Sequence, residues 1–407
     1  MGGRCSSRLP GDNPKDAKGS KSQIIGSVVV DHAAQILSVP GHDQFEAFRE
    51  QVVDWEEQGV LCKFCSGQVC DLVAGESKED KFQLKPLTGE IFYGNGGMNS
   101  IPAAIISSTN DSVTLEENVW VSPSNGVKFL GDKGRPKWKV KKNGLSLGTF
   151  DRIVIAHNGK CADRLMSKTP AKKLHSLLRT NFAASVSRSG GKRMTLNSIY
   201  SYTFAINREG SVLNQHLGPD VICCFIKNEP NLRFLTCQTR KEHTGQPVQD
   251  KTVEVWTILS SPKFAKVHKA PQENIPRETA DNVIDLLLQA LETSLSLIPG
   301  SLTRDAILDS KLQLWGAAVP MNVWTSNSTV ASEHGHGFLF DSDFGVGACG
   351  DWLLDPSIGG AWTSGLNLAD FMIQQDEMRK SHNVGLPPNG GFQASEAALA
   401  AGIGNVR

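Results

Sequence analysis

The sequence predicts a mixed α/β (α+β) fold, a large part of which is a mainly antiparallel sheet. Between residues 194 and 262, the segments "ICCFIKN", "LRFLTCQT" and "TVEVWTILSS" are rich in β-branched and aromatic residues and read as consecutive strands. The short apolar run "RIVIA", at 152–156, is typical of a strand buried on both faces. Two longer segments, 42–59 and 276–299, have the periodicity of helices instead, which completes the mixed class.

The helices are predicted from spacing and from their end signals. In "HDQFEAFREQVVDWEEQG" the apolar residues at 45, 48, 52 and 55 lie on one helix face, and Gly59 is a natural stop. A second helix is expected from about Asn99, with Pro102 in its first turn. The longest helix is expected to start near Pro276 and to end before Pro299.

The remaining segments are assigned by composition. Strands are predicted for Ile24 to Asp31, for "DSVTLEENVWVSP", "PKWKVKK", "LGTFDRIVIAHNG" and "SKLQLWGAAVP", and for two pieces of "HGFLFDSDFGVGACGDW". Helices are predicted for "PAKKLHSLLRTNF" and from about Ala361. Beyond Gln375 the chain is rich in Gly, Pro and Asn, which predicts a flexible tail with a short helix in "SEAALAAG".

Composition limits the function classes. A chain of 407 residues allows two to three domains at about 100–200 residues each. The 42 basic and 42 acidic residues balance, so neither nucleic acid nor a membrane is expected as a partner. No apolar run is long enough for a membrane span, and the first 25 residues have no signal-peptide core. A cytoplasmic protein is expected, with an organelle such as the chloroplast open for a longer form.

The nine cysteines predict reduced thiols rather than a disulfide framework, because they are scattered and odd in number. "CKFCSGQVC", at 62–70, is a weak zinc candidate, since the adjacent Cys223 and Cys224 do not supply a second pair at matching spacing. "EHGH", with Glu333, His334 and His336, is weaker still. No metal ligand is therefore predicted.

The stretch "GACGDWLLDPSIGGAWTSGLNLADFM", at 347–372, is the most informative segment. A strand of small residues ends at Gly350 and Asp351, and a glycine-rich turn then opens a helix. A helix N-terminus has free N–H groups and a partial positive charge, so it can hold an electron-rich group that glycines allow to approach. A carboxylate at the strand end can accept hydrogen bonds from a polyol. The alternative is that the glycines only let the helix pack tightly on the strand.

A serine-hydrolase elbow does not fit the same stretch. The pattern G-x-S-x-G around Ser364 fails because Trp362 stands in the place of the first glycine.

The stretch resembles the C-terminal flavin motif of the FAD-dependent amine oxidase superfamily, and most closely its renalase-like branch of FAD/NAD(P)-binding oxidoreductases. Other segments resemble that family in the same order: "MGGRCSSR", "VVDHAAQI", "YGNGGMNSIPAAI", "ENVWVSP", "FDRIVIAHNG" and "LQLWGAAVP", in which Trp315 and Pro320 match. The resemblance spans about residues 1–376 and implies FAD as the cofactor. The matching cofactor-binding positions are Gly2, Gly3, Arg4, Ser6, Asp31, Gln35, Val119, Gly350, Asp351, Gly360, Ala361 and Trp362.

The resemblance implies a doubly wound FAD-binding sheet beside a mainly antiparallel substrate domain. The expected FAD-binding domain comprises 1–40, 96–175 and 326–378, the substrate domain comprises 41–95 and 176–325, and 379–407 form the tail. The family's G-x-G-x-x-G unit, which holds the pyrophosphate, has no counterpart near the start of this sequence. The expectation is therefore an N-terminally truncated, incomplete domain. Ile36 and Ala317 also depart from the family, which often has Tyr there.

The implied function is that of an FAD-dependent oxidoreductase of the renalase or amine oxidase type. A hydride would pass to the flavin from a small reduced substrate, either an amine or a reduced nicotinamide such as NAD(P)H. No catalytic side chain is predicted. His32 and Gln35 are the nearest polar candidates, although His32 also suits a capped strand end. The alternatives are a truncated chain that binds no FAD and is inactive, and a two-domain binding protein without a cofactor.

Overall fold

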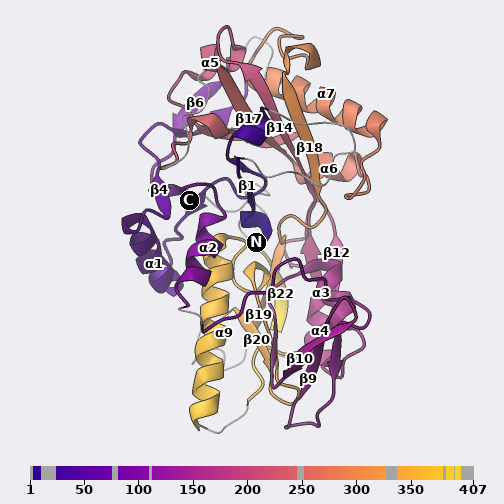
Figure 1. The fold of residues 1–407 in the computed structure, drawn as a ribbon. Helices are drawn as coiled ribbons and strands as arrows, with labels where there is room; N and C mark the ends of the chain where they lie inside the picture. The colour runs from indigo at the N-terminus through magenta and orange to yellow at the C-terminus, as the bar shows by residue number, and fades with distance from the viewer. Residues whose placement is uncertain are drawn as a thin grey trace.

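The computed structural model describes residues 3–10, 24–75, 81–109, 112–244, 252–326, 337–378, 382–388 and 390–395. Figure 1 shows a large sheet with its helices at one end of the molecule and several small sheets with the long helix α9 (Ile358–Met378) at the other. Within the described ranges, no helix is both long enough and apolar enough to cross a membrane.

The large sheet has seven strands in the order β18-β14-β17-β16-β15-β5-β6. Neighbouring strands run antiparallel except β15 and β5, which are parallel. The antiparallel series predicted between 194 and 262 is therefore confirmed, and the sequence-distant β5 extends it. The bounds are β5 Val69–Val73, β6 Gln83–Pro86, β14 Ile199–Asn207, β15 Cys223–Lys227, β16 Leu232–Cys237, β17 Val253–Ser260 and β18 Asp309–Trp315.

Three helices cover this sheet (Figure 1): α5 (Val212–Leu217), α6 (Pro262–Val267) and α7 (Arg277–Ser294). Helix α7 begins directly after Pro276, as predicted. Its buried face, which includes Leu287 and Leu291, shares one core with sheet residues such as Trp256. The apolar stripe of this helix therefore explains its place on the sheet.

The other end of the molecule is built from short elements around a second core. The sheet β11-β21-β20 has three strands, of which β11 and β21 are parallel, and α9 packs on β20 and β21. A second three-stranded sheet has the order β10-β9-β8. The pairs β12·β13 and β19·β22 and the helices α3 and α4 complete this end. The bounds are β8 Val127–Phe129, β9 Trp138–Lys142, β10 Leu145–Phe150, β11 Ile153–Ile155, β12 Thr180–Phe182, β13 Met194–Leu196, β19 Asn322–Ser326, β20 Phe338–Asp341, β21 Val346–Cys349, β22 Gly390–Ala394, α3 Gly159–Met166 and α4 Lys172–Leu178.

A third group of elements lies beside α9. Helix α1 follows a short 3-10 turn and buries Phe45, Phe48, Val52 and Trp55, the four apolar positions predicted to share a face. Helix α2 includes Pro102 near its start, as predicted. The bounds here are β1 Ser7–Arg8, β2 Val30–Asp31, β3 Leu37–Ser38, α1 Glu46–Glu57, β4 Leu61–Lys63, β7 Ile91–Gly94 and α2 Ser100–Ser107.

Four local expectations differ from the structure. Residues 112–123 form no strand, and Asn118 has a left-handed φ of 54° that interrupts an extended chain. In β11, Val154 is 43% exposed, so this strand is not buried on both faces. Of the strand predicted for Ile24 to Asp31, only β2 is a paired strand, because 25–27 form a 3-10 turn. Residues 390–394, expected in the flexible tail, form β22 against β19. The helix proposed for "SEAALAAG" lies outside the described residues.

Candidate functional site

A buried ion pair joins the N-terminal part of the chain to the large sheet. Asp31, at the end of β2, is fully buried, and its Oδ2 accepts a hydrogen bond from Lys241 Nζ at 2.8 Å. The other carboxylate oxygen accepts hydrogen bonds from Ser7 Oγ at 2.6 Å and from the backbone N–H of Met98 at 2.8 Å. Both oxygens of Asp31 are thus satisfied, as a buried charge requires.

Two glutamine side chains extend this centre into the sheet. Lys241 Nζ also donates to the backbone oxygen of Gln35 at 2.9 Å, and Gln35 Nε2 donates to the backbone oxygen of Asp31 at 2.6 Å. Gln238 Nε2 donates to Gln35 Oε1 at 2.8 Å and to Thr257 Oγ1, on β17, at 3.0 Å. The result is a polar network buried between three segments that are remote in sequence, which fixes their relative positions.

His243 lies at the edge of this network, against the glycine-rich turn after β7. Its Nδ1 accepts a hydrogen bond from the backbone N–H of Gly96 at 3.0 Å. Burial lowers the pKa of His243 to about 4, with Asp31 opposing and Lys241 adding to the shift. The imidazole is therefore neutral near pH 7, and its proton is on Nε2, because Nδ1 is an acceptor. Nε2 is buried without a hydrogen-bond partner among the described residues, so it is a donor available to a ligand.

Two other titratable side chains near Asp31, those of His32 and Cys5, are also held in their neutral forms. Burial lowers the pKa of His32 to about 4, and the charge of Lys311 adds to that shift. Burial raises the pKa of the Cys5 thiol to about 11, although Arg4 opposes this. At neutral pH neither side chain provides a thiolate or an imidazolium. We therefore assign no general acid or base to this region.

Arg4 and Asp351 form a second ion pair, which unites two elements that the resemblance assigns to one cofactor. Arg4 Nη2 donates to Asp351 Oδ2, and Arg4 Nη1 donates to the backbone oxygen of Ala318 at 2.6 Å. Asn158 Nδ2 reaches the other oxygen of Asp351 at 3.4 Å. The Arg4 side chain is 32% exposed, whereas that of Asp351 is 5% exposed. The arginine side chain is thus partly open to solvent, and the aspartate side chain is not.

The strand end before Asp351 is shaped by a serine of α9. Gly350 has a φ of 144°, and its N–H donates to Ser364 Oγ at 2.8 Å. The Ser364 hydroxyl in turn donates to the backbone oxygen of Gly337. Trp352 Nε1 and Thr363 Oγ1, which lie close by in the sequence, are buried without a partner among the described residues. Two polar atoms on this side of the molecule are thus unsatisfied by the protein.

The glycines that open α9 are explained by packing. A Cβ on Gly360 would lie 2.0 Å from the backbone oxygen of Asp355, and one on Gly359 would lie 2.8 Å from the ring of Phe48. The Trp362 ring packs on Phe48, with centroids 5.6 Å apart. Helix α9 also begins at Ile358, three residues before the predicted start. Close packing against Asp355 is therefore sufficient to explain the glycine at 360, and the expectation that it keeps an approach path open stays a prediction.

The remaining predicted positions are dispersed. Gly3 lies in a 3-10 turn with open space at its Cβ position, and the backbone oxygen of Ser6 accepts a hydrogen bond from the N–H of His32 at 3.5 Å. Ala361 is exposed on α9. Val119 lies in the irregular segment where a strand was expected, and Gly2 is outside the described residues. Lys241, Gln238 and His243 were not predicted, because no local motif distinguishes them from surface residues in "CQTRKEHTG".

No group of three or more His, Cys, Asp or Glu side chains that could hold a metal occurs in the described part of the chain. The cysteines of "CKFCSGQVC" fall on separate elements, and Cys70 pairs in register with Cys224 across β5 and β15. "EHGH" lies outside the described residues.

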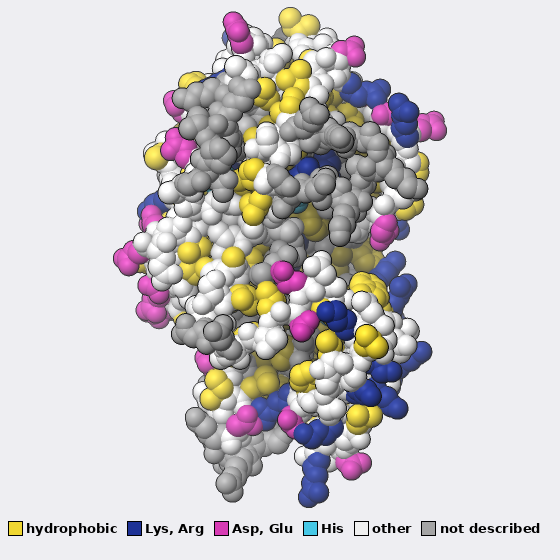
Figure 2. All heavy atoms as spheres, in the orientation of Figure 1, with side chains coloured by type: hydrophobic (Ala, Val, Ile, Leu, Met, Phe, Trp, Pro, Cys, Tyr) yellow, Lys and Arg dark blue, Asp and Glu magenta, His cyan; other side chains and the backbone are white. Residues whose placement is uncertain are grey.

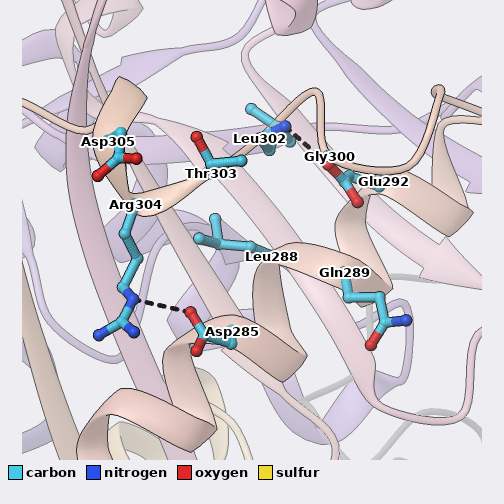
Figure 3. A pocket seen from close by; sticks show the side chains of 9 residues that line it. All are labelled: Asp285, Leu288, Gln289, Glu292, Gly300, Leu302, Thr303, Arg304 and Asp305. Carbon is cyan, nitrogen blue, oxygen red and sulfur yellow. Dashed lines mark hydrogen bonds and ion pairs between the residues drawn. The ribbon is translucent and has the colours of Figure 1, made fainter.

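A hollow of about 350 Å³ lies elsewhere, between α7 and residues 300–305 (Figure 3). Three of its charged side chains already have protein partners: Arg304 contacts Asp285, and also Asp281 outside the hollow, each at 2.8 Å, and Glu292 accepts the N–H of Leu302 at 2.7 Å. None of the predicted site residues lines it. We interpret it as a notch in the helix-loop packing, separate from the site around Asp31 and Asp351.

Comparison with known proteins concerns the fold. No protein-family model matches the chain. The structure is similar to that of an oxidoreductase from Methanosarcina mazei, with a TM-score of 0.51, 10% sequence identity, and coverage of 89% of this chain and 93% of that one. This likeness shows a shared overall fold.

Two further similarities have lower scores. One is to a candidate protoporphyrinogen oxidase from Exiguobacterium sp. 255-15, with a TM-score of 0.44, 10% identity, and coverage of 72% of this chain and 54% of that one. The other is to the glycerol-3-phosphate dehydrogenase from Bacillus halodurans complexed with FAD, with a TM-score of 0.41, 13% identity, and coverage of 86% and 57%. The chain thus spans little more than half the length of these two proteins.

Proposed function

We propose that this chain is an FAD-dependent oxidoreductase of the renalase or amine oxidase type, which accepts a hydride from a small reduced substrate. The observation that carries the proposal is the contact between Arg4 and Asp351, which are 347 positions apart in sequence. The resemblance assigns both to the flavin, one through "MGGRCSSR" and the other through "GACGDW". The fold shared with an oxidoreductase of matching length supports the proposal.

Unsatisfied polar atoms test whether the chain fits this cofactor. Buried without a partner, among the described residues, are Trp315 Nε1, Trp352 Nε1, Asn99 Oδ1, His243 Nε2 and Thr363 Oγ1. Such groups lose free energy when they are unpaired, and natural proteins keep few of them. Trp315, Trp352, Asn99 and Thr363 belong to or adjoin segments that carry the resemblance, and His243 lies at the edge of the Asp31 network. A polar heteroaromatic cofactor would supply their partners, so these residues fit.

Each group has a role set by its geometry. Arg4, whose side chain is partly exposed, would bind an anionic or polyol portion of the cofactor through charge-assisted bonds. Asp351 would accept hydrogen bonds from ribityl hydroxyls. His243 would donate from Nε2 as a neutral imidazole. Lys241 would hold Asp31 and Gln35 in place instead of acting as a base, because its ammonium is engaged by both.

The bound flavin supplies the redox chemistry by accepting the hydride. The protein's part is to orient the substrate and exclude water. We place the cofactor side in the segments 1–40, 96–175 and 326–378 and the substrate side in 41–95 and 176–325, which include the seven-stranded sheet. An amine and a reduced nicotinamide such as NAD(P)H are the two substrate classes to test.

A second candidate is a chain that binds no FAD and has no activity. The observations in its favour are that Arg4 and Asp351 already satisfy one another and that protein atoms occupy the space at Gly359 and Gly360. In this alternative, the Arg4–Asp351 pair only stabilises the fold by holding two distant segments together.

Titration with FAD separates the two candidates. We expect saturable quenching of FAD fluorescence by the purified chain and a shift of the flavin absorbance bands. Asp351→Asn should weaken FAD binding by about tenfold or more, since a charge-assisted hydrogen bond contributes about 1.5–3 kcal/mol. Asp376→Asn is the matched control, because Asp376 also pairs with an arginine, Arg152, but on the surface. No saturation by FAD would favour the inactive chain.

A further inference from the structure

The chain is neutral overall, but its charges are segregated. Residues 128–193 contain 17 Lys and Arg but only 3 Asp and Glu, whereas the whole chain has 42 of each. This segment forms β9–β12, α3, α4 and most of β8, and we call it the basic lobe. Figure 2 shows Lys and Arg side chains gathered at the lower right of the molecule, where Figure 1 places these elements. Three of these basic residues pair with acidic residues from outside the segment: Lys133 with Asp343, Lys142 with Glu116 and Arg152 with Asp376. A balanced total charge therefore conceals a segment that is net positive even after these pairs are counted.

One face of the sheet β10-β9-β8 is lined by lysines. The register places Lys128 opposite Lys139, and Lys141 opposite Ser146, so these side chains share a face. The alternate residue Trp138 is completely buried, so the lysine face is the outer one. Like charges directly opposite one another destabilise a sheet. No ion pair between described residues neutralises these three lysines, and a large anionic surface would remove their repulsion.

The helices of the basic lobe add to the same charge. Lys160 and Arg164, four residues apart, are exposed on α3, and Lys172 and Lys173 are exposed at the start of α4. The two helices and Trp138 pack on one hydrophobic core. The positive charges are thus held on one rigid lobe.

The turn between β9 and β10 adds exposed apolar groups to the lysines. The hairpin turns at Asn143 and Gly144, which have φ values of 49° and 86°. Immediately after it, Leu145 is 75% exposed and Leu147 is 36% exposed. Leu145 pairs in register with Lys142 at the tip, so it lies on the opposite face of the sheet from Lys141. Exposed aliphatic groups beside lysines are typical of surfaces that bind the interface of an anionic bilayer. The lysine face has no Arg, Asn, Gln or aromatic group to read or stack a base, which argues against nucleic acid.

We propose that the basic lobe docks on an anionic phospholipid bilayer, with the tip of the β9–β10 hairpin at the headgroup level. Helix α1 lies on the other side of the molecule in Figure 1 and carries exposed Glu46, Glu50, Asp54, Glu56 and Glu57. The same side is rich in acidic side chains in Figure 2. This separation of charge would orient the molecule with α1 away from the bilayer. The proposal goes beyond the proposed function and does not depend on it.

Vesicle co-sedimentation of the full chain tests the proposal. We expect binding to phosphatidylcholine vesicles that contain about one third phosphatidylserine, little binding to pure phosphatidylcholine, and a loss of binding as salt rises. The double variant K139E/K141E should reduce binding by about tenfold or more, because each lysine near an anionic surface contributes a several-fold effect. Its melting temperature should be unchanged or higher, since the carboxylate introduced at position 139 would face Lys128.

Two further variants separate the hairpin from general charge. L145S/L147S should weaken vesicle binding by several-fold without changing its dependence on salt, because only apolar area is lost. K263E/K266E removes two exposed lysines from α6, outside the basic lobe, and should leave binding unchanged. Equal losses in K263E/K266E and K139E/K141E would overturn the proposal. So would tighter binding of a single-stranded 20-mer oligonucleotide than of the anionic vesicles, with loss in K139E/K141E.

Discussion

Two ion pairs join the N-terminal part of this chain to residues that are remote in sequence. They differ in how far the side chains are buried and in how many hydrogen bonds the protein supplies to them. In the Asp31–Lys241 pair both side chains are buried, and every oxygen of the carboxylate has protein donors. In the Arg4–Asp351 pair the carboxylate is buried, but the arginine side chain as a whole is 32% exposed. The first pair has the features of a structural centre, and the second has capacity left for a ligand.

The difference teaches which residues to associate with function. A buried, fully bonded pair is costly to break and resists a change of partner. A partly open arginine can exchange or add a partner at little cost. We therefore propose a positioning role for Asp31 and Lys241, and a ligand-binding role for Arg4 and Asp351.

Removing the buried cation gives the largest expected effect. Lys241→Met should lower the free energy of unfolding by about 3–5 kcal/mol, because it leaves the Asp31 carboxylate buried without its counter-charge. Urea denaturation measures this. The double variant Asp31→Asn, Lys241→Met should recover much of the loss, since no charge remains buried. A loss below about 1 kcal/mol in Lys241→Met would show that the pair is not a structural centre.

Two glycines of α9 test whether the Asp351 side is closed by packing. Gly360→Ala should destabilise the protein by about 2–4 kcal/mol, because its Cβ would lie 2.0 Å from a backbone oxygen. Gly365→Ala in the same helix is the matched control, with nothing within 4 Å of its Cβ, and should stabilise by up to about 1 kcal/mol. Thermal melts show whether each variant has a lower or a higher melting temperature than the unmodified chain. Equal changes in melting temperature for the two variants would contradict this account of the glycines.

The two histidines near Asp31 predict a stability that falls in acid. Burial lowers the pKa values of His32 and His243 to about 4. Below about pH 6.5 the unfolded state binds more protons, so this stability is complete above pH 6.5 and is lost as the pH falls toward 4. Each imidazole should contribute on the order of 1–2 kcal/mol, allowing for partial exposure. His243→Gln should flatten this part of the stability profile, and an unchanged slope would refute the assignment.

The open pair should contribute least to stability. Asp351→Asn should change the free energy of unfolding by about 1 kcal/mol or less, because the arginine that loses its partner is partly exposed and keeps its bond to the backbone oxygen of Ala318. Equilibrium denaturation beside Lys241→Met gives the comparison directly. If the two variants lose equal stability, the contrast between the pairs is invalid.

Local sequence signals predicted the elements well and the site only in part. The apolar spacing at 45, 48, 52 and 55 determines α1 because a helix face is a local property. Of the Asp31 network, Asp31 and Gln35 were predicted, but Lys241 and Gln238 were not. The latter two reach the network only because strands distant in sequence pair in the fold. The strand expected at 112–123 failed where Asn118 adopts a left-handed conformation. The role of Gly360 depends on Asp355, a contact that composition does not specify.

The most direct test of the central claim is to titrate FAD into the purified chain and into Asp351→Asn, with Asp376→Asn as the control. The account predicts saturable binding by the unmodified chain and by Asp376→Asn. It predicts affinity at least about tenfold weaker in Asp351→Asn, with nearly unchanged stability. Absence of saturable FAD binding, or equal affinity in all three proteins, would contradict the claim that Arg4 and Asp351 form part of a flavin site.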